Sequence, residues 1–282
     1  MPSTTLLIAL SRSLIFKLPL ALFGVDSRVS ILSFRCLALW SLGYPEAALT
    51  DAEHALKDAR EVGQAATLMY ALSFTLWTNI FCGNYATAAA QAQKLAALAE
   101  EKDAMFWKAL GMMDQGCVLA LTGKASDAVR MITSGITAWW STGSTLNILS
   151  FLPHLAIAYA ELGQFDDARR CIGEAMKAVE TTKERWWEAE VCRTAGEIAL
   201  KSPEPDAAKT EAYFERALAV ARQQQAKSWE LRAAMSMARL WRDKGKRDEA
   251  RDLLAPIYGW FTEGFDTLDL KQAKALLDEL AS

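Results

Sequence analysis

The stretch HLAIAYAELGQFDDARR, residues 154–170, contains the features that set the fold. Ala156 is small, Tyr159 is aromatic, Gly163 follows four residues later, and Ala168 comes five residues after the glycine. A glycine adopts the left-handed conformation that ends a helix, and small residues let two helices approach closely. The stretch therefore predicts two antiparallel helices joined by a tight turn at Gly163.

The same pattern recurs along the 282 residues with a period of about 40. Each unit carries a turn glycine: Gly43, Gly83, Gly123, Gly163 and Gly245. An alanine lies five residues after each of them: Ala48, Ala88, Ala128, Ala168 and Ala250. The last interval, of 82 residues, holds one more unit, in which Gly196 takes the small position and KSPEPDAAKT (201–210) replaces the glycine turn. Apolar residues between these positions follow helical spacing.

We therefore predict an all-α chain of about six helical hairpins. Their ranges are 26–63, 64–103, 104–143, 144–183, 184–226 and 227–265. A last helix, Thr267 to Leu280, is expected to cap the array. Its exposed side is predicted to carry Asp269, Lys271, Lys274 and Asp278.

This pattern resembles the tetratricopeptide repeat, although its period exceeds the usual length of about 34 residues. Two units match in full, through Ala156, Tyr159, Gly163 and Ala168, and through Ala238, Trp241, Gly245 and Ala250. Asn79 and Leu119 replace the aromatic residue in two others. The resemblance implies a right-handed α-solenoid that holds a protein or peptide partner.

Four longer strings resemble a narrower group, the C-terminal repeat region of bacterial signalling proteins with a class III adenylate or guanylate cyclase domain and an AAA-type ATPase module. They are LGYPEAAL (42–49), ERWWEAE (184–190), QQAKSWELRAAMSMARLW (224–241) and LLAPIYGWFTEGFDTLDLKQAKALL (253–277). This resemblance spans about residues 23–282 and implies a detached or truncated sensory arm of such a signalling protein, without the cyclase active site.

The N-terminal segment, residues 1–24, is apolar but does not match the repeats. Arg12 and Lys17 interrupt it, so it falls short of the roughly 20 apolar residues that span a bilayer. We expect it to belong to a helix pair whose earlier half is missing from this chain, with a membrane or export role as the alternative. The repeats are predicted to form one domain over 25–282, and the uncapped N-terminal end is a candidate surface for self-association.

Composition argues against several functions. A formal net charge of −3 gives no electrostatic reason to expect nucleic acid. Five widely spaced cysteines form no C-x-x-C pair and predict small buried side chains in a reducing cytoplasm.

No motif predicts an enzyme. GCVLALTGKAS (116–126) lacks the spacing and the hydroxyl of a P-loop, and the two histidines, His54 and His154, have no metal-ligand spacing. Three neighbouring carboxylates, those of Glu184, Glu188 and Glu190, are better explained by helical ion pairs with nearby basic residues than by acid–base catalysis. We expect no metal and no cofactor.

The concave groove is the expected partner site, because the first helix of each hairpin lines it in tetratricopeptide solenoids. Its early part would be apolar, with Trp40, Tyr70, Trp77 and Met113. Its late part would be charged, with Glu190, Arg193, Glu197, Arg232, Arg239 and Arg242. Arginine forks suit carboxylates, so a peptide with an acidic end would fit.

Two alternatives stay open at this point. The early strip could be buried by neighbouring helices or by a missing N-terminal repeat, and the chain could sense a small ligand between its repeats. Trp107, Trp187 and Trp229 each lie nine residues before the small position of their repeat, which predicts a packing role for these three.

Overall fold

The computed structural model describes residues 24–144 and 148–281, and these residues form thirteen helices and no strand. The helices are α2 (Ser27–Ser41), α3 (Pro45–Val62), α4 (Ala65–Phe81), α5 (Tyr85–Glu101), α6 (Met105–Leu121), α7 (Ala125–Ser141), α8 (Ile148–Glu161), α9 (Phe165–Thr182), α10 (Glu188–Lys201), α11 (Ala207–Gln223), α12 (Lys227–Asp243), α13 (Arg247–Tyr258) and α14 (Leu268–Ala281). The prediction for residues 1–23 lies outside the described residues.

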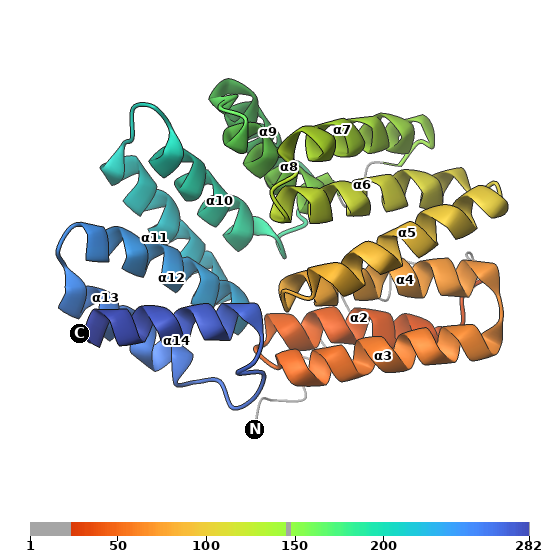
Figure 1. Ribbon diagram of the computed structural model, residues 1–282, viewed down its shortest axis with the longest axis horizontal. Helices are drawn as coiled ribbons and strands as arrows, with labels where there is room; N and C mark the ends of the chain where they lie inside the picture. The colour runs from red at the N-terminus through yellow and green to blue at the C-terminus, as the bar shows by residue number, and fades with distance from the viewer. Residues whose placement is uncertain (1–23, 145–147, 282) are drawn as a thin grey trace.

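Consecutive helices pair into six antiparallel hairpins that stack in chain order, followed by α14 (Figure 1). The hairpins are α2–α3, α4–α5, α6–α7, α8–α9, α10–α11 and α12–α13, and each falls within its predicted range. The all-α solenoid predicted from the repeated glycine and alanine positions is confirmed.

The turn at Gly43 shows why glycine recurs at this position. Its φ is +93°, a left-handed conformation that is strained for other residues. The N–H of Gly43 donates to Trp40 O at 2.9 Å and the N–H of Tyr44 to Leu39 O at 2.9 Å. This pair of bonds is the Schellman motif, which satisfies the last carbonyls of a helix. The later turn glycines also have positive φ: Gly83, Gly123, Gly163 and Gly245.

The two helices of a hairpin touch at small residues. All five alanines of the pattern are 0% exposed: Ala48, Ala88, Ala128, Ala168 and Ala250. In the third hairpin, a Cβ added to Gly116 would lie 3.0 Å from the backbone nitrogen of Ile132 and would also collide with the Ile132 side chain. The glycine at this position is therefore required by close helix packing.

Replacing Gly116 with alanine is expected to lower the free energy of unfolding by about 1–3 kcal/mol, the usual cost of overpacking. The collision with Ile132 should outweigh the better helix propensity of alanine. Gly173 is the matched control, because it also lies inside a helix but has no atom within 4 Å of an added Cβ. Gly173→Ala should raise the free energy of unfolding by about 0.5–1 kcal/mol. Urea unfolding of both variants measures the difference, and equal effects would contradict this account.

The fifth hairpin turns without glycine. Helix α10 ends at Lys201, and the next residue, Ser202, has an extended backbone. Asp206 caps α11 by accepting a 2.9 Å hydrogen bond from the N–H of Lys209. The prediction that Gly196 takes the small position of this hairpin is confirmed, because a Cβ added to Gly196 would collide with the ring of Phe214.

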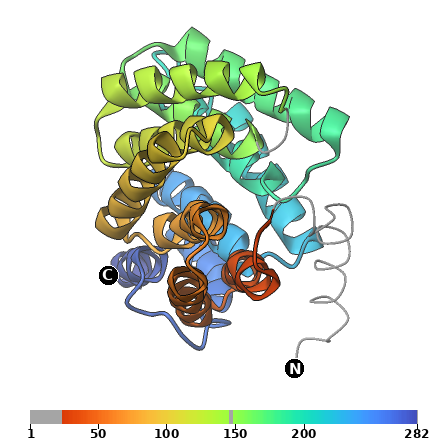
Figure 2. The same cartoon turned by 90° about the vertical axis from the view of Figure 1, so that its right-hand side faces the viewer.

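The solenoid closes on itself, because α12 packs against α2. Ser228 Oγ donates to Trp40 O at 2.5 Å, and the N–H of Ala47 donates to Glu263 Oε1 at 2.9 Å. The N–H of Leu268 donates to Cys82 O at 3.3 Å. Figure 2 shows the blue helices of the last hairpin beside the orange helices of the first two. We call this contact between the C-terminal and N-terminal repeats the seam.

Turn glycines take part in the seam as well. A Cβ on Gly43 would lie 2.5 Å from the Trp260 ring and 2.9 Å from Lys227 Cβ, and one on Gly83 would collide with Leu268. The seam therefore depends on the backbone of the first two turns approaching the C-terminal residues closely.

Two expectations change with the closed shape. The early apolar strip is covered by other helices, with Trp40 at 2%, Trp77 at 6% and Met113 at 0% exposure, so the alternative that neighbouring helices bury the strip holds for these side chains. The prediction that Asp269 lies on an exposed side of the last helix is wrong, because Asp269 is half-buried and bonds to Arg232 of α12. Lys271, Lys274 and Asp278 are exposed as predicted.

A carboxylic acid lies inside the core between α4 and α6. Asp114 is 0% exposed, and Ser73 Oγ donates to its Oδ2 at 3.3 Å. Its Oδ1 has no hydrogen-bond partner among the described residues. Burial raises the pKa of Asp114 well above its ordinary value, although the bond from Ser73 opposes this shift.

Asp114 predicts a pH dependence of stability. The folded state keeps a proton that the unfolded state releases above pH about 4, so the free energy of unfolding should fall as the pH rises from there towards the folded-state pKa. Asp114→Asn stays neutral and should flatten this fall in urea titrations across the pH range. The same change at Asp166, whose side chain is 96% exposed, should leave the profile as it is. An unchanged slope in Asp114→Asn would contradict the role of Asp114.

The five cysteines are all free and buried, as their spacing predicted. Over residues 24–144 and 148–281, no helix has both the length and the apolar character needed to cross a membrane.

Candidate functional site: a charged pocket inside the solenoid

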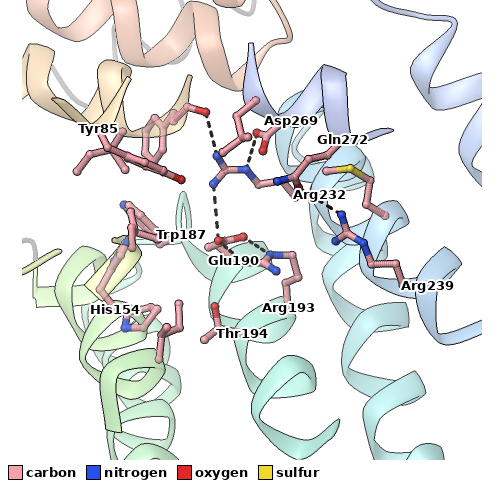
Figure 3. A pocket seen from close by; sticks show the side chains of 17 residues that line it. Tyr85, His154, Trp187, Glu190, Arg193, Thr194, Arg232, Arg239, Asp269 and Gln272 are labelled. Carbon is pink, nitrogen blue, oxygen red and sulfur yellow. Dashed lines mark hydrogen bonds and ion pairs between the residues drawn. The ribbon is translucent and has the colours of Figure 1, made fainter. Parts of the chain in front are cut away.

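A pocket of about 160 Å³ lies where the first helices of several hairpins meet the last helix (Figure 3). Helices α4, α8, α10, α12 and α14 all contribute side chains to it. They come from the concave side of the solenoid, where sequence placed the partner groove.

One wall of the pocket is aromatic and centres on Trp187, which is 1% exposed. The Trp187 ring packs edge-on against Trp77 at 5.4 Å and lies 5.3 Å from Trp229, centroid to centroid. Phe81 and His154 lie at 5.7 and 5.8 Å. Such aromatic pairs contribute beyond their buried area. The predicted packing role of Trp187 and Trp229 is confirmed, and Trp77 joins the same cluster.

Arg232 links the two ends of the solenoid at the pocket. Its Nε donates to Asp269 Oδ2 at 2.6 Å and its Nη2 to the carbonyl oxygen of Phe81 at 3.0 Å. Its Nη1 lies 3.7 Å from Glu190 Oε1, so the guanidinium sits between two carboxylates (Figure 3). It also stacks over Trp40, with its central carbon 5.0 Å from the ring centroid.

Glu190 is held by a second arginine. Arg193 Nε and Nη2 each donate to one carboxylate oxygen of Glu190 at 2.7 Å, a two-pronged pair that is geometrically favourable. Burial alone would raise the pKa of Glu190, but the charges of Arg193 and Arg232 outweigh it and lower this pKa. Arg193 also reaches Glu197 Oε1 at 3.4 Å, and Ser236 Oγ donates to the same oxygen at 2.6 Å. Glu190 is therefore a charged, fully paired group at neutral pH.

Arg239 differs from the other two arginines of the pocket. Its Nη2 donates to Gln272 Oε1 at 3.3 Å, and it forms no ion pair with a carboxylate in the described part of the chain. Burial lowers the pKa of Arg239; the nearby charge of Glu197 opposes this shift, whereas those of Arg193 and Arg242 add to it. The surroundings of Arg239 therefore disfavour its positive charge.

His154 is a neutral group in the pocket wall. It is 6% exposed, and burial lowers its pKa to about 4. Its Nδ1 lies 2.8 Å from the carbonyl oxygen of Ser150, which fits an N–H donor at this position. In that tautomer the other ring nitrogen, Nε2, is an acceptor.

Two further lining residues have buried polar atoms without a partner. Thr194 Oγ1 and Trp187 Nε1 have no hydrogen bond among the described residues, and both residues are 1% exposed. An unsatisfied buried donor costs about 1–3 kcal/mol. Such groups beside a pocket are suited to meet a ligand or a water.

The structure brings together four of the candidate residues predicted from the repeat register: Glu190, Arg193, Arg232 and Arg239. Glu197 lies beside them, and Arg242 lies further out, where it bonds to Glu279 Oε2 at 3.0 Å.

The apolar candidates lie elsewhere. Trp40 and Trp77 pack in the aromatic cluster behind the pocket, and Met113 is in the core. Tyr70 stacks on Phe74 at 4.4 Å, away from the pocket lining.

Sequence reasoning missed His154, Thr194 and Asp269 as lining residues. His154 and Thr194 each lie two residues before the small position of their repeat, a position that the groove register did not include. No sequence pattern predicted that Asp269 lines the pocket, because its position depends on how α14 packs at the seam.

The described residues contain no cluster of three or more histidine, cysteine, aspartate or glutamate side chains that could hold a metal ion. The side chains that line the pocket can form ion pairs with a charged group and can donate hydrogen bonds to it.

Comparison with known proteins agrees with this architecture. Residues 154–174 match the tetratricopeptide repeat family model, which covers most of α8 and the first half of α9. No curated protein matches the sequence. The chain is similar in structure to the apo form of RapI, with a TM-score of 0.61 and 12% identity over 98% of this chain and 94% of that one.

A second solved structure is a Signal Transduction ATPase with Numerous Domains (STAND) protein with a tetratricopeptide repeat sensor, from Pyrococcus horikoshii. Its TM-score is 0.48 and its identity 15%, over 98% of this chain and 42% of that one. The repeat match at residues 154–174 and the similarity to RapI agree with an α-solenoid of tetratricopeptide-like hairpins.

Proposed function

We propose that this chain is a non-catalytic regulatory module that holds a protein or peptide partner and seats an acidic group of that partner in the central pocket. The observation that carries the proposal is the convergence of Glu190, Arg193, Arg232 and Arg239 from two first helices on one pocket. Arginine forks on a concave repeat surface suit carboxylates.

The narrower sequence resemblance supports a more specific setting for this module. We propose that it acts in the cytoplasm as the sensory arm of a cyclase or ATPase signalling protein. Self-association through the N-terminal end stays a prediction, and size-exclusion chromatography with light scattering would measure it.

Partner capture tests the module function. The partner is identified by mass spectrometry in a pull-down with the wild-type chain, and the bound amount is then compared for Arg239→Gln and Arg251→Gln. Arg239 lines the pocket, whereas Arg251 is an exposed arginine of α13 that pairs with Asp248, which makes it a matched control. Loss of the partner with Arg239→Gln and its retention with Arg251→Gln supports the proposal. Equal capture by all three chains would contradict it.

A small-ligand sensor is the second candidate, and the pocket itself favours it. The pocket volume is close to the roughly 150 Å³ of a cavity that accommodates benzene, so it suits a small molecule or one side chain. Because residues of the seam line it, a bound molecule would contact both ends of the solenoid. Thermal-shift screening tests this, since a ligand at a hundred times its dissociation constant adds about 2.7 kcal/mol of stability.

A further inference from the structure

The charges that line the pocket do not balance. Three guanidinium groups, from Arg193, Arg232 and Arg239, meet two carboxylates, from Glu190 and Asp269. Arg193 and Glu190 pair through two bonds of 2.7 Å, and Arg232 pairs with Asp269 at 2.6 Å. These four groups form two ion pairs. Among the residues that line the pocket, the positive charge of Arg239 therefore has no carboxylate partner.

Glu197 does not take up this charge. Its carboxylate is engaged by Ser236 at 2.6 Å and by Arg193 at 3.4 Å, and it forms no ion pair with Arg239 among the described residues. The bond of Arg239 to Gln272 is to a neutral amide oxygen, at 3.3 Å. A guanidinium has five N–H donors, so most of its capacity is still available.

Buried polar groups nearby are also unsatisfied. Thr194 Oγ1 and Trp187 Nε1 lack a partner among the described residues, and both belong to the pocket wall. Both can donate a hydrogen bond, and an anion needs donors around it as well as a positive charge. Figure 3 shows Thr194 just below Glu190 and Arg193, and Arg239 on the other side of Arg193.

We propose that the pocket is a carboxylate-binding site in which Arg239 pairs with the carboxylate while Thr194 and Trp187 complete its polar surroundings. The assignment deepens the proposed function and rests on it, because it names the chemistry of the group that enters the pocket. The volume of about 160 Å³ limits that group to roughly six non-hydrogen atoms, the size of benzene. It comes either from a free small acid or from the carboxyl end of a peptide.

Paired probes distinguish the two sources and isolate the charge. Lactate is titrated against lactamide, and N-acetyl-tetraalanine with a free carboxyl end against its amide, by calorimetry with the full chain. Each pair differs only in the carboxylate. Tighter binding of lactate than of lactamide assigns a free acid, and tighter binding of the free peptide end than of its amide assigns a peptide. If neither carboxylate binds more tightly than its amide, the proposal is overturned.

Variants place the binding in the pocket. Arg239→Gln and Thr194→Val should each weaken carboxylate binding at least tenfold, which is about 1.4 kcal/mol. Thr194→Val keeps the shape of a side chain whose hydroxyl has no partner, so it should fold as the wild type does. Arg251→Gln, at an exposed arginine of α13 that pairs with Asp248 outside the pocket, should bind as the wild type does. Undiminished binding by Arg239→Gln or by Thr194→Val would overturn the assignment.

Folding of Arg239→Gln is checked by its melting temperature, and Arg239→Lys provides a second variant that keeps the charge but loses the fork. Its affinity should lie between those of the wild type and Arg239→Gln. The titrations test carboxylate binding and the pull-down tests partner binding, so a negative result in one is distinguishable from a negative result in the other. Partner capture that persists without carboxylate binding would overturn this inference alone, whereas carboxylate binding without any partner would contradict the module function.

Discussion

Replacing Arg232 with methionine is expected to lower the free energy of unfolding by about 3–5 kcal/mol, the usual cost of breaking a buried ion pair from one side. The change leaves Asp269 without its 2.6 Å bond and removes one of the two cations beside Glu190. The Arg232 side chain is only 16% exposed, so water cannot easily replace it. Urea unfolding measures the loss.

The same substitution should loosen the seam. Arg232 contacts Phe81 of the second hairpin and Asp269 of the last helix at once, so its removal uncouples the two ends. Small-angle scattering should show a larger radius of gyration. Arg242→Met is the control, because Arg242 pairs at 3.0 Å with a half-exposed Glu279, and such pairs contribute about 0–1 kcal/mol. Equal losses in the two variants would rule out a special role of Arg232.

Replacing Trp187 with alanine is expected to destabilise the chain by about 3–5 kcal/mol, as for other large aromatic residues cut back inside a core. Trp187 touches the rings of Trp77 and Phe81 of α4 and the ring of Trp229 of α12, so the cavity would open where several repeats converge. Near-ultraviolet circular dichroism should lose intensity together with stability.

Trp140 provides the comparison for Trp187. Its side chain is 58% exposed at the end of α7, and Trp140→Ala should change the free energy of unfolding by no more than about 0.5 kcal/mol. A loss at Trp140 as large as that at Trp187 would mean that burial does not explain the effect.

The hairpins could be predicted from sequence because their signals are local. Gly163 and Ala168 specify one turn and one helix contact within a few residues, and the same physics repeats in each unit. The seam could not be predicted in this way. Whether α12 reaches α2 depends on the small rotation that each hairpin adds, and these rotations accumulate over the whole array.

In the candidate site, too, local features could be predicted from sequence and contacts between distant repeats could not. Arg232 and Arg239 line the same pocket, because repeat register fixes which residues of a first helix share a side. Their role in binding a partner stays a prediction. Trp40 lies on that side as well, but it became buried once the last hairpin covered it. Asp269 was misplaced because the pattern of its own helix cannot reveal an arginine that approaches from α12.

The seam changes what kind of solenoid this is. Open repeat arrays interact only between neighbours, so their ends fray first and units can be added or deleted with a graded effect. Here the first and last hairpins share hydrogen bonds, and the number of repeats is tied to the geometry of that junction. Evolution or an engineer could not insert or remove a 40-residue unit without parting the ends. Unfolding should begin with separation of the seam and then spread through the whole ring.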